Sequence, residues 1–184
     1  RSRIELGERL GALDPTSVRA DGYEIFTGAK LLAPSSSHGW NREQVINRHD
    51  ILRSGARWKG LTRQVQVVQR QATLPRQHLV LDSGDDALAS LLAQTDPRTV
   101  RLDLQGAPLL AAHFGQDPVS GEWLLALLHH HMVCDHVTLE FIVGEIHLIL
   151  SGQAEKLPPA LPYRNFIAQT LAVPASEHEG YFKR

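Results

Sequence analysis

The reactive side chains of this sequence gather in one short segment, Leu128–Thr138, which reads LHHHMVCDHVT. Four of the ten histidines fall within eight residues there, and a carboxylate, Asp135, lies between the third and the fourth. A neutral imidazole can accept or donate a proton, and a nearby carboxylate can orient the ring. One interpretation of the segment is therefore a histidine that performs acid–base chemistry.

Two other interpretations of the cluster stay open at this point. The histidines can be ordinary core or surface residues whose ring nitrogens are hydrogen-bonded. They can also hold a metal, although His131 and His136 are too few for a catalytic zinc site and the sequence has no His-Glu-x-x-His helix. We expect no metal.

The elements on either side of the cluster explain how a histidine would be held in place. Trp123–Leu128 is apolar on both faces, which predicts a central strand covered by helices. It follows the apolar run Leu109–Phe114 across a Pro/Gly turn, so the two predict a β-hairpin. A helix is predicted over Val137–Leu150, with Thr138 available as a cap and Gly152 closing it.

The rest of the chain alternates between predicted strands and helices. Further strands are predicted at Tyr23–Leu32, broken at Gly28, at Leu61–Gln69 and at Leu79–Leu81. Helices are predicted at Arg42–Leu52 and at Asp85–Gln94. One or two more helices, split near Pro174, are predicted at the C-terminal end. This pattern predicts an α/β fold: a two-layer sandwich with a mixed sheet covered by helices.

Composition excludes several classes of function. The chain has 184 residues, 42% of them hydrophobic, and 19 Lys and Arg against 20 Asp and Glu, so it lacks the basic excess typical of nucleic-acid binders. No apolar stretch reaches the roughly 20 residues of a membrane span, and the first residues contain no apolar leader. The single cysteine excludes an intrachain disulfide framework. We expect a cytoplasmic protein.

The pattern His130-His131-x-x-x-Asp135, followed by a capped helix, resembles the HHxxxDG signature of condensation domains in nonribosomal peptide synthetases. The wider chloramphenicol-acetyltransferase-like superfamily shares this signature. Because the aspartate fixes the register, His130 and His131 are the motif pair, and His136 stands where the family usually has glycine.

Further segments match the same family in the same order. Arg48–Ser54 is similar to the family's RHExLRT motif. Val100–Leu104 with Pro108–Leu110 resembles DL…PLLR, and Leu157–Pro159 with Tyr163–Ala168 resembles LPP…YxDYA. The resemblance covers about residues 45 to 184, whereas residues 1–44 match the family poorly.

The resemblance implies a fold and a set of roles. The chain, residues 1–184, would be the N-terminal lobe of a chloramphenicol-acetyltransferase-like fold, with the C-terminal lobe of the domain absent. His131 would act in catalysis, and His130, Asp135, Arg48 and Arg53 would be structural, with an ion pair from Asp135 to one of the two arginines. His136 could line the substrate channel.

The implied reaction joins two acyl groups carried as phosphopantetheine thioesters on donor and acceptor carrier-protein domains, and it gives an amide. No cofactor would bind this chain directly, no nucleic acid or membrane would be a partner, and the isolated lobe would be inactive.

The alternatives within the fold are an epimerisation domain and an ester-forming acyltransferase, although Val137–Glu140 favours condensation. An alternative of a different kind is a non-catalytic scaffold that docks carrier proteins.

Overall fold

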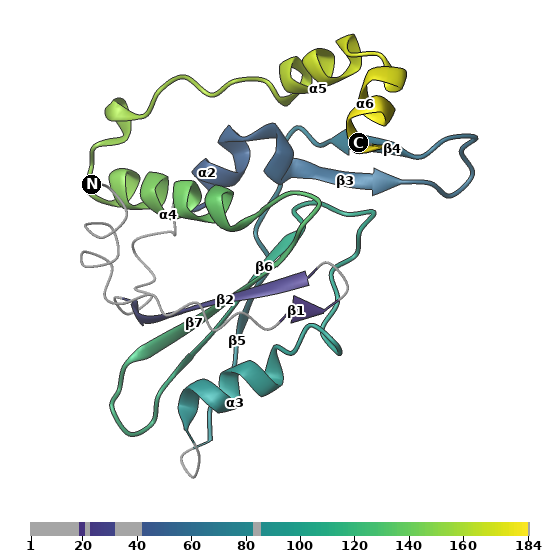
Figure 1. Cartoon of the computed structure of the whole chain (residues 1–184). Coiled ribbons are helices and arrows are strands. Elements are labelled where there is room, and N and C mark those ends of the chain that lie inside the picture. Colours follow the sequence, from purple (N-terminus) through teal and green to yellow (C-terminus); the bar gives the residue numbers. More distant parts are fainter. Residues whose placement is uncertain (1–18, 21–22, 32–41, 83–85, 184) are drawn as a thin grey trace.

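The computed structural model describes residues 19–20, 23–31, 42–82 and 86–183, and a five-stranded sheet lies at its centre (Figure 1). The strand order is β1-β2-β7-β6-β5. The strands are β1 Arg19–Ala20, β2 Tyr23–Leu31, β5 Arg76–His78, β6 Leu110–Gln116 and β7 Trp123–His130. β5 and β6 are parallel and every other neighbouring pair is antiparallel, so the predicted mixed sheet is confirmed.

Strand β7 occupies the centre of the sheet because it is apolar on both faces. Leu125 and Leu127 pack on the side of helices α2 (Arg42–Arg48) and α4 (His136–Leu150). Leu124, Ala126 and Leu128 pack on the opposite side with helix α3 (Ala87–Gln94). Helices therefore cover both faces of the sheet (Figure 1), and α3 adds a layer to the predicted sandwich.

The helix that follows β7 begins and ends at residues with defined caps. Asp135 is the N-cap of α4, in place of the predicted Thr138. At the other end Gly152 has a φ of 70°, its amide bonds to the Ile149 carbonyl at 3.1 Å, and the Gln153 amide bonds to the Leu148 carbonyl at 2.8 Å. This pair of bonds is a Schellman motif, which favours glycine at its left-handed position.

A second sheet, of two strands, projects to one side of the first (Figure 1). It consists of β3 (Ser54–Arg57) and β4 (Val65–Val68), and the short 3-10 helix η1 (Asp50–Arg53) leads into it from α2. Gly55 in β3 lies directly against the backbone of Gly106.

The C-terminal part consists of a 3-10 turn, η2 (Ala154–Lys156), an extended connector, and helices α5 (Tyr163–Ala172) and α6 (Ala175–Phe182). The predicted split near Pro174 is confirmed. Neither helix has a buried residue. None of the helices among the described residues is long and apolar enough to cross a membrane.

Several boundaries predicted from the sequence are wrong. The strand expected over Leu61–Gln69 covers only Val65–Val68, and its partner β3 was not predicted. The strand expected at Leu79–Leu81 lies three residues earlier, as β5. The backbone bonds that join this segment to β6 begin at the Pro75 carbonyl and end at the Leu79 amide. Pairing of β2 with β7 runs through Gly28, and the register shifts between Ala29 and Leu31. The helix expected over Arg42–Leu52 ends at Arg48 and continues as the tighter η1.

The close contact at Gly55 leads to a stability prediction. A Cβ atom at Gly55 would lie 2.1 Å from the Gly106 carbonyl oxygen, so Gly55→Ala should lower the free energy of unfolding by about 2 kcal/mol through overpacking. Gly144→Ala is the matched control, because its Cβ meets no atom within 4 Å and alanine favours a helix by about 1 kcal/mol. Urea unfolding measures both, and a neutral Gly55→Ala would contradict the contact.

Candidate active site

The turn after β7 is held by the backbone and the ring of His130. The His130 amide donates to the Leu109 carbonyl at 3.1 Å, and the Val133 amide donates to the His130 carbonyl at 3.0 Å. The Met132 amide donates to His130 Nδ1 at 3.1 Å, which requires the ring to be an acceptor there. Burial, and then the neighbouring His131, lower the pKa of His130, which favours the neutral ring that this bond needs.

His131 is the exposed member of the histidine run. Its ring meets that of His129 edge to face, with 5.6 Å between centroids, and His129 is buried at 1% exposure. The alternation predicted for the strand thus places His129 and His131 together, while the ring of His130 folds back onto its own turn. Of the two histidines of the motif, His131 is the more exposed to solvent.

Asp135 follows this turn and caps helix α4. Its Oδ1 accepts the Thr138 amide at 2.8 Å, and hydrogen bonds from the Thr138 side chain and then from its backbone hold the pKa of Asp135 below its usual range. The positive charge of a protonated His131 would lower this pKa further. Asp135 is exposed to solvent, so its bonds fix the direction of α4 relative to the turn.

The ion pair predicted between Asp135 and an arginine is wrong, because both arginines bind other groups. Arg53 lies 2.5 Å from Asp50, and Arg48 binds Glu145 and the Pro158 carbonyl. The two arginines lie instead at the end of α2 and in η1, where their partners are carboxylates and backbone carbonyls.

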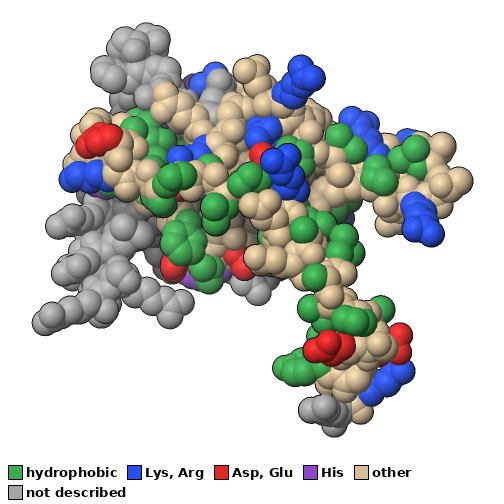
Figure 2. Space-filling view, turned by 90° about the horizontal axis from the view of Figure 1, so that it is seen from above, with side chains coloured by type: hydrophobic (Ala, Val, Ile, Leu, Met, Phe, Trp, Pro, Cys, Tyr) green, Lys and Arg blue, Asp and Glu red, His purple; other side chains and the backbone are tan. Residues whose placement is uncertain are grey.

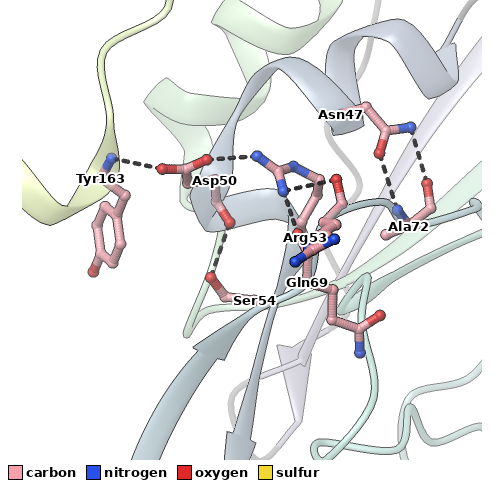
Figure 3. A network of polar contacts seen from close by, with 8 residues as sticks. Asn47, Asp50, Arg53, Ser54, Gln69, Ala72 and Tyr163 are labelled. Carbon is pink, nitrogen blue, oxygen red and sulfur yellow. Dashed lines mark hydrogen bonds and ion pairs between the residues drawn. The ribbon is translucent and has the colours of Figure 1, made fainter.

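That segment forms a polar network (Figure 3). One oxygen of Asp50 binds Arg53, and the other accepts the backbone amide of Tyr163 at the start of α5, at 3.1 Å. Arg53 in turn donates to the carbonyls of Gln69 and Arg70, just beyond β4. The Asp50 backbone carbonyl accepts the Ser54 hydroxyl at 2.9 Å.

Asn47 extends the network by a two-way bond with the backbone of Ala72 (Figure 3). Its side-chain oxygen accepts the Ala72 amide at 2.9 Å, and its Nδ2 donates to the Ala72 carbonyl at 3.2 Å. The network therefore connects α2 and η1 to the end of β4 and to α5.

A second contact joins α2 to α4 through Glu145, a residue that the sequence analysis missed. The Glu145 Oε2 lies 2.7 Å from His49 Nε2, and Oε1 lies 3.4 Å from Arg48 Nε. The available signal was a single carboxylate within the apolar run Ile142–Leu150, since a mostly buried carboxylate needs cationic or donor partners. We call Arg48, His49 and Glu145 the α2–α4 clamp.

His136 begins helix α4 and is about half exposed. Its Nε2 lies 3.1 Å from Glu140 Oε1, one turn further along the same helix. The predicted position of His136 in a substrate channel stays a prediction. Among the described residues, no group of three His, Cys, Asp or Glu side chains could hold a metal ion.

Known proteins match this chain over most of its length. A sequence model described as a condensation domain matches residues 42–180. Malpinin synthetase of Mortierella alpina is 44% identical over 143 residues, and malpibaldin synthetase of the same organism is 42% identical over 144 residues. Each match covers 77% of this chain but only 2% and 3%, respectively, of the two synthetases.

Solved structures share the fold. One is described as a condensation domain that mediates chain release from the enacyloxin polyketide synthase. It matches with a TM-score of 0.61 and 23% identity, and the match covers 94% of this chain and 35% of that one. Another is the epimerization domain of the third module of tyrocidine synthetase B, with a TM-score of 0.61 and 18% identity over 80% of this chain and 35% of that one.

The cap of α4 leads to a prediction about Asp135. Asp135→Ala should lower the free energy of unfolding by about 1 kcal/mol near neutral pH, whereas Asp135→Asn should retain most of it, because asparagine caps helices as well as aspartate does. The lowered pKa means that the charged cap stabilises the fold above the unfolded-state pKa of about 3.9, and that this contribution is lost as the pH falls through the folded-state pKa. Thermal melts from neutral to acidic pH test this; equal melting of parent and Asp135→Ala at neutral pH would refute it.

The α2–α4 clamp leads to a second prediction. Glu145→Gln and His49→Ala should each destabilise the fold by about 1 to 2 kcal/mol, because the contact is neither fully exposed nor fully buried. In a double-mutant cycle the two changes should couple by about 1 kcal/mol, since both act on the same contact between Glu145 and His49. Additive effects would show that the two side chains act independently.

Proposed function

The chain belongs to the condensation-domain family, and on that basis we propose that it supplies one lobe of a domain that forms an amide bond between two carrier-tethered substrates. The observation that carries the proposal is the turn after β7, where His131 is exposed. The ring of His130 before it is bonded to the turn, and helix α4 after it is capped by Asp135. The family match, and the relatives named as synthetases, support a role in nonribosomal peptide assembly.

The proposed reaction needs a group that handles one proton. The acceptor's amine nitrogen forms a bond to the donor's thioester carbon, the carbon–sulfur bond breaks, and the sulfur leaves as a thiol that takes the proton lost by the amine. His131 would accept this proton or hold the amine in place during attack, and both roles use a neutral ring nitrogen. The central strand β7, packed on both faces, supplies a rigid mount for it.

His130 and Asp135 would act by positioning His131. The bond from the Met132 amide to His130 fixes the turn on one side of His131, and the Asp135 cap fixes the helix on the other. Neither group needs to touch a substrate for this role. His136, exposed beside Glu140, would line the approach to the turn.

The second lobe of the domain would come from further polypeptide. The chain spans 35% of the enacyloxin-related chain and 35% of the epimerization domain of tyrocidine synthetase B. Helices α5 and α6 leave large apolar side chains exposed, among them Phe166, Leu171 and Phe182, which is costly without a covering surface. We propose that residues 1–184 are the N-terminal lobe and that the C-terminal lobe closes the channel.

The partners of the complete domain would be donor and acceptor carrier-protein domains, whose phosphopantetheine arms present the two thioesters. The shared fold does not separate condensation from epimerisation, because the structural matches include both. A carrier-docking scaffold without chemistry is the other outcome of the test below.

The test compares the two motif histidines in the complete two-lobed domain. His131→Ala should reduce single-turnover amide formation from two loaded carrier proteins about 100-fold or more, the usual effect of removing a positioned acid–base group, with the fold intact. His130→Ala is the matched control and should mainly lower thermal stability, because it removes the bond that holds the turn.

Circular dichroism checks that both variants fold. A folded His131→Ala domain with the parent's rate would exclude catalysis by His131. Formation of an epimerised product without an amide would assign the domain to epimerisation, and binding of carriers without any product would favour the scaffold.

A further inference from the structure

The hairpin of β3 and β4 and the segment that follows it differ in charge from the rest of the molecule. Residues 54–81, which run from β3 past β5, contain five of the 19 Lys and Arg residues, three of them in the hairpin, and none of the 20 Asp and Glu residues, so the remaining chain has 14 basic against 20 acidic residues. The five cations are all exposed: Arg57, Lys59, Arg63, Arg70 and Arg76. No ion pair among the described residues involves any of them.

The same hairpin exposes apolar side chains. All four residues of β4 are exposed, including Val65, Val67 and Val68, each at 40% to 45% of its full surface. Trp58 and Leu61, in the connecting turn, are exposed to a similar degree. Seen from above, the projecting end at the right of Figure 2 combines hydrophobic and basic side chains, and no acidic side chain is visible on it.

The outer edge of β4 has backbone groups available for pairing. The Gln69 amide bonds to the Arg53 carbonyl, and the Ala56 amide bonds to the Leu104 carbonyl, on the side of β3 away from β4. Antiparallel strands alternate between residues that bond to the partner and residues that face outward, so these bonds place the amides and carbonyls of Gln66 and Val68 on the outer edge. No backbone bond from a described residue reaches that edge.

The base of the hairpin is held firmly, which makes its surface preorganised. Arg53 binds the carbonyls of Gln69 and Arg70, and Asn47 binds both backbone groups of Ala72. A partner that binds β4 would therefore not have to order the hairpin first.

We propose that the edge of β4 binds an extended, acidic segment of a partner protein, which adds to the β3–β4 sheet as a third strand. The outward groups of Gln66 and Val68 bond to the segment's backbone, the valines contact its apolar side chains, and the flanking cations pair with its carboxylates. Binding of a nucleic acid would leave the valines unused and would bring phosphates close to the acidic remainder of the chain.

Fluorescence anisotropy on the whole chain tests the proposal. The probe is a labelled peptide of alternating glutamate and valine, about six residues long, the usual length of a strand. The chain should bind this peptide and should not bind its lysine–valine counterpart. A duplex DNA oligonucleotide and phosphatidylserine vesicles serve as competing polyanions.

Two variants separate the two parts of the surface. Arg57→Gln/Arg63→Gln should weaken binding of the acidic peptide at least 10-fold, whereas Arg164→Gln/Lys183→Gln, with the same change of net charge on α5 and beyond α6, should not. Gln66→Pro removes an outward amide without removing a bond to β3, and it should also weaken binding at least 10-fold.

Melting temperatures show that each variant still folds. No binding by the parent, tighter binding of DNA or vesicles than of the acidic peptide, or full binding by Gln66→Pro would each overturn the proposal.

Discussion

The carboxylate of Asp50 is the point at which separate parts of this molecule depend on one another. One oxygen holds Arg53, and through it the chain just beyond β4, while the other holds the first amide of α5, 113 residues further along. A single carboxylate thus links η1 both to the chain beyond β4 and to the start of α5. Because the group is only partly buried, it accepts these bonds without the full desolvation cost of a buried charge.

At the site, residues that are adjacent in the sequence have different structural roles. β7 is apolar on both faces and supplies stiffness, His130 and Asp135 satisfy backbone amides, and His131 is left exposed. The α2–α4 clamp adds a constraint from the far half of α4 through Glu145. Residues in one short motif therefore differ in role because their polar atoms have different partners.

Much of the fold could be predicted from periodicity. The hairpin of β6 and β7, the central place of β7 and helices α3 and α4 all follow from apolar spacing and from the Pro/Gly turn. β5 was misplaced because its residues, Arg76–His78, are exposed and polar, and only the bonds to β6 define them as a strand. Their apolar neighbours Leu79 and Leu81 are buried in the core, and this apolar pattern resembled that of a strand.

The site was predicted less well where partners lie far apart in the sequence. The register of His130, His131 and Asp135 is local, but Asp135 caps α4 instead of pairing with an arginine as predicted. The partners of Arg48 and Arg53 could not be deduced, because Glu145 is 97 residues from Arg48 and the other acceptors are backbone carbonyls, which carry no sequence signal.

The pairing of β2 with β7 affects how the chain can be made. Tyr23 pairs with His130, more than 100 residues further along the chain, and β7 is the last strand of the sheet to be synthesised. At about 5 to 20 residues per second, a ribosome needs roughly 5 to 20 seconds to pass from one to the other. During that time β2 has no neighbour on its inner side, and an unpaired strand edge can pair with the same strand of another nascent copy.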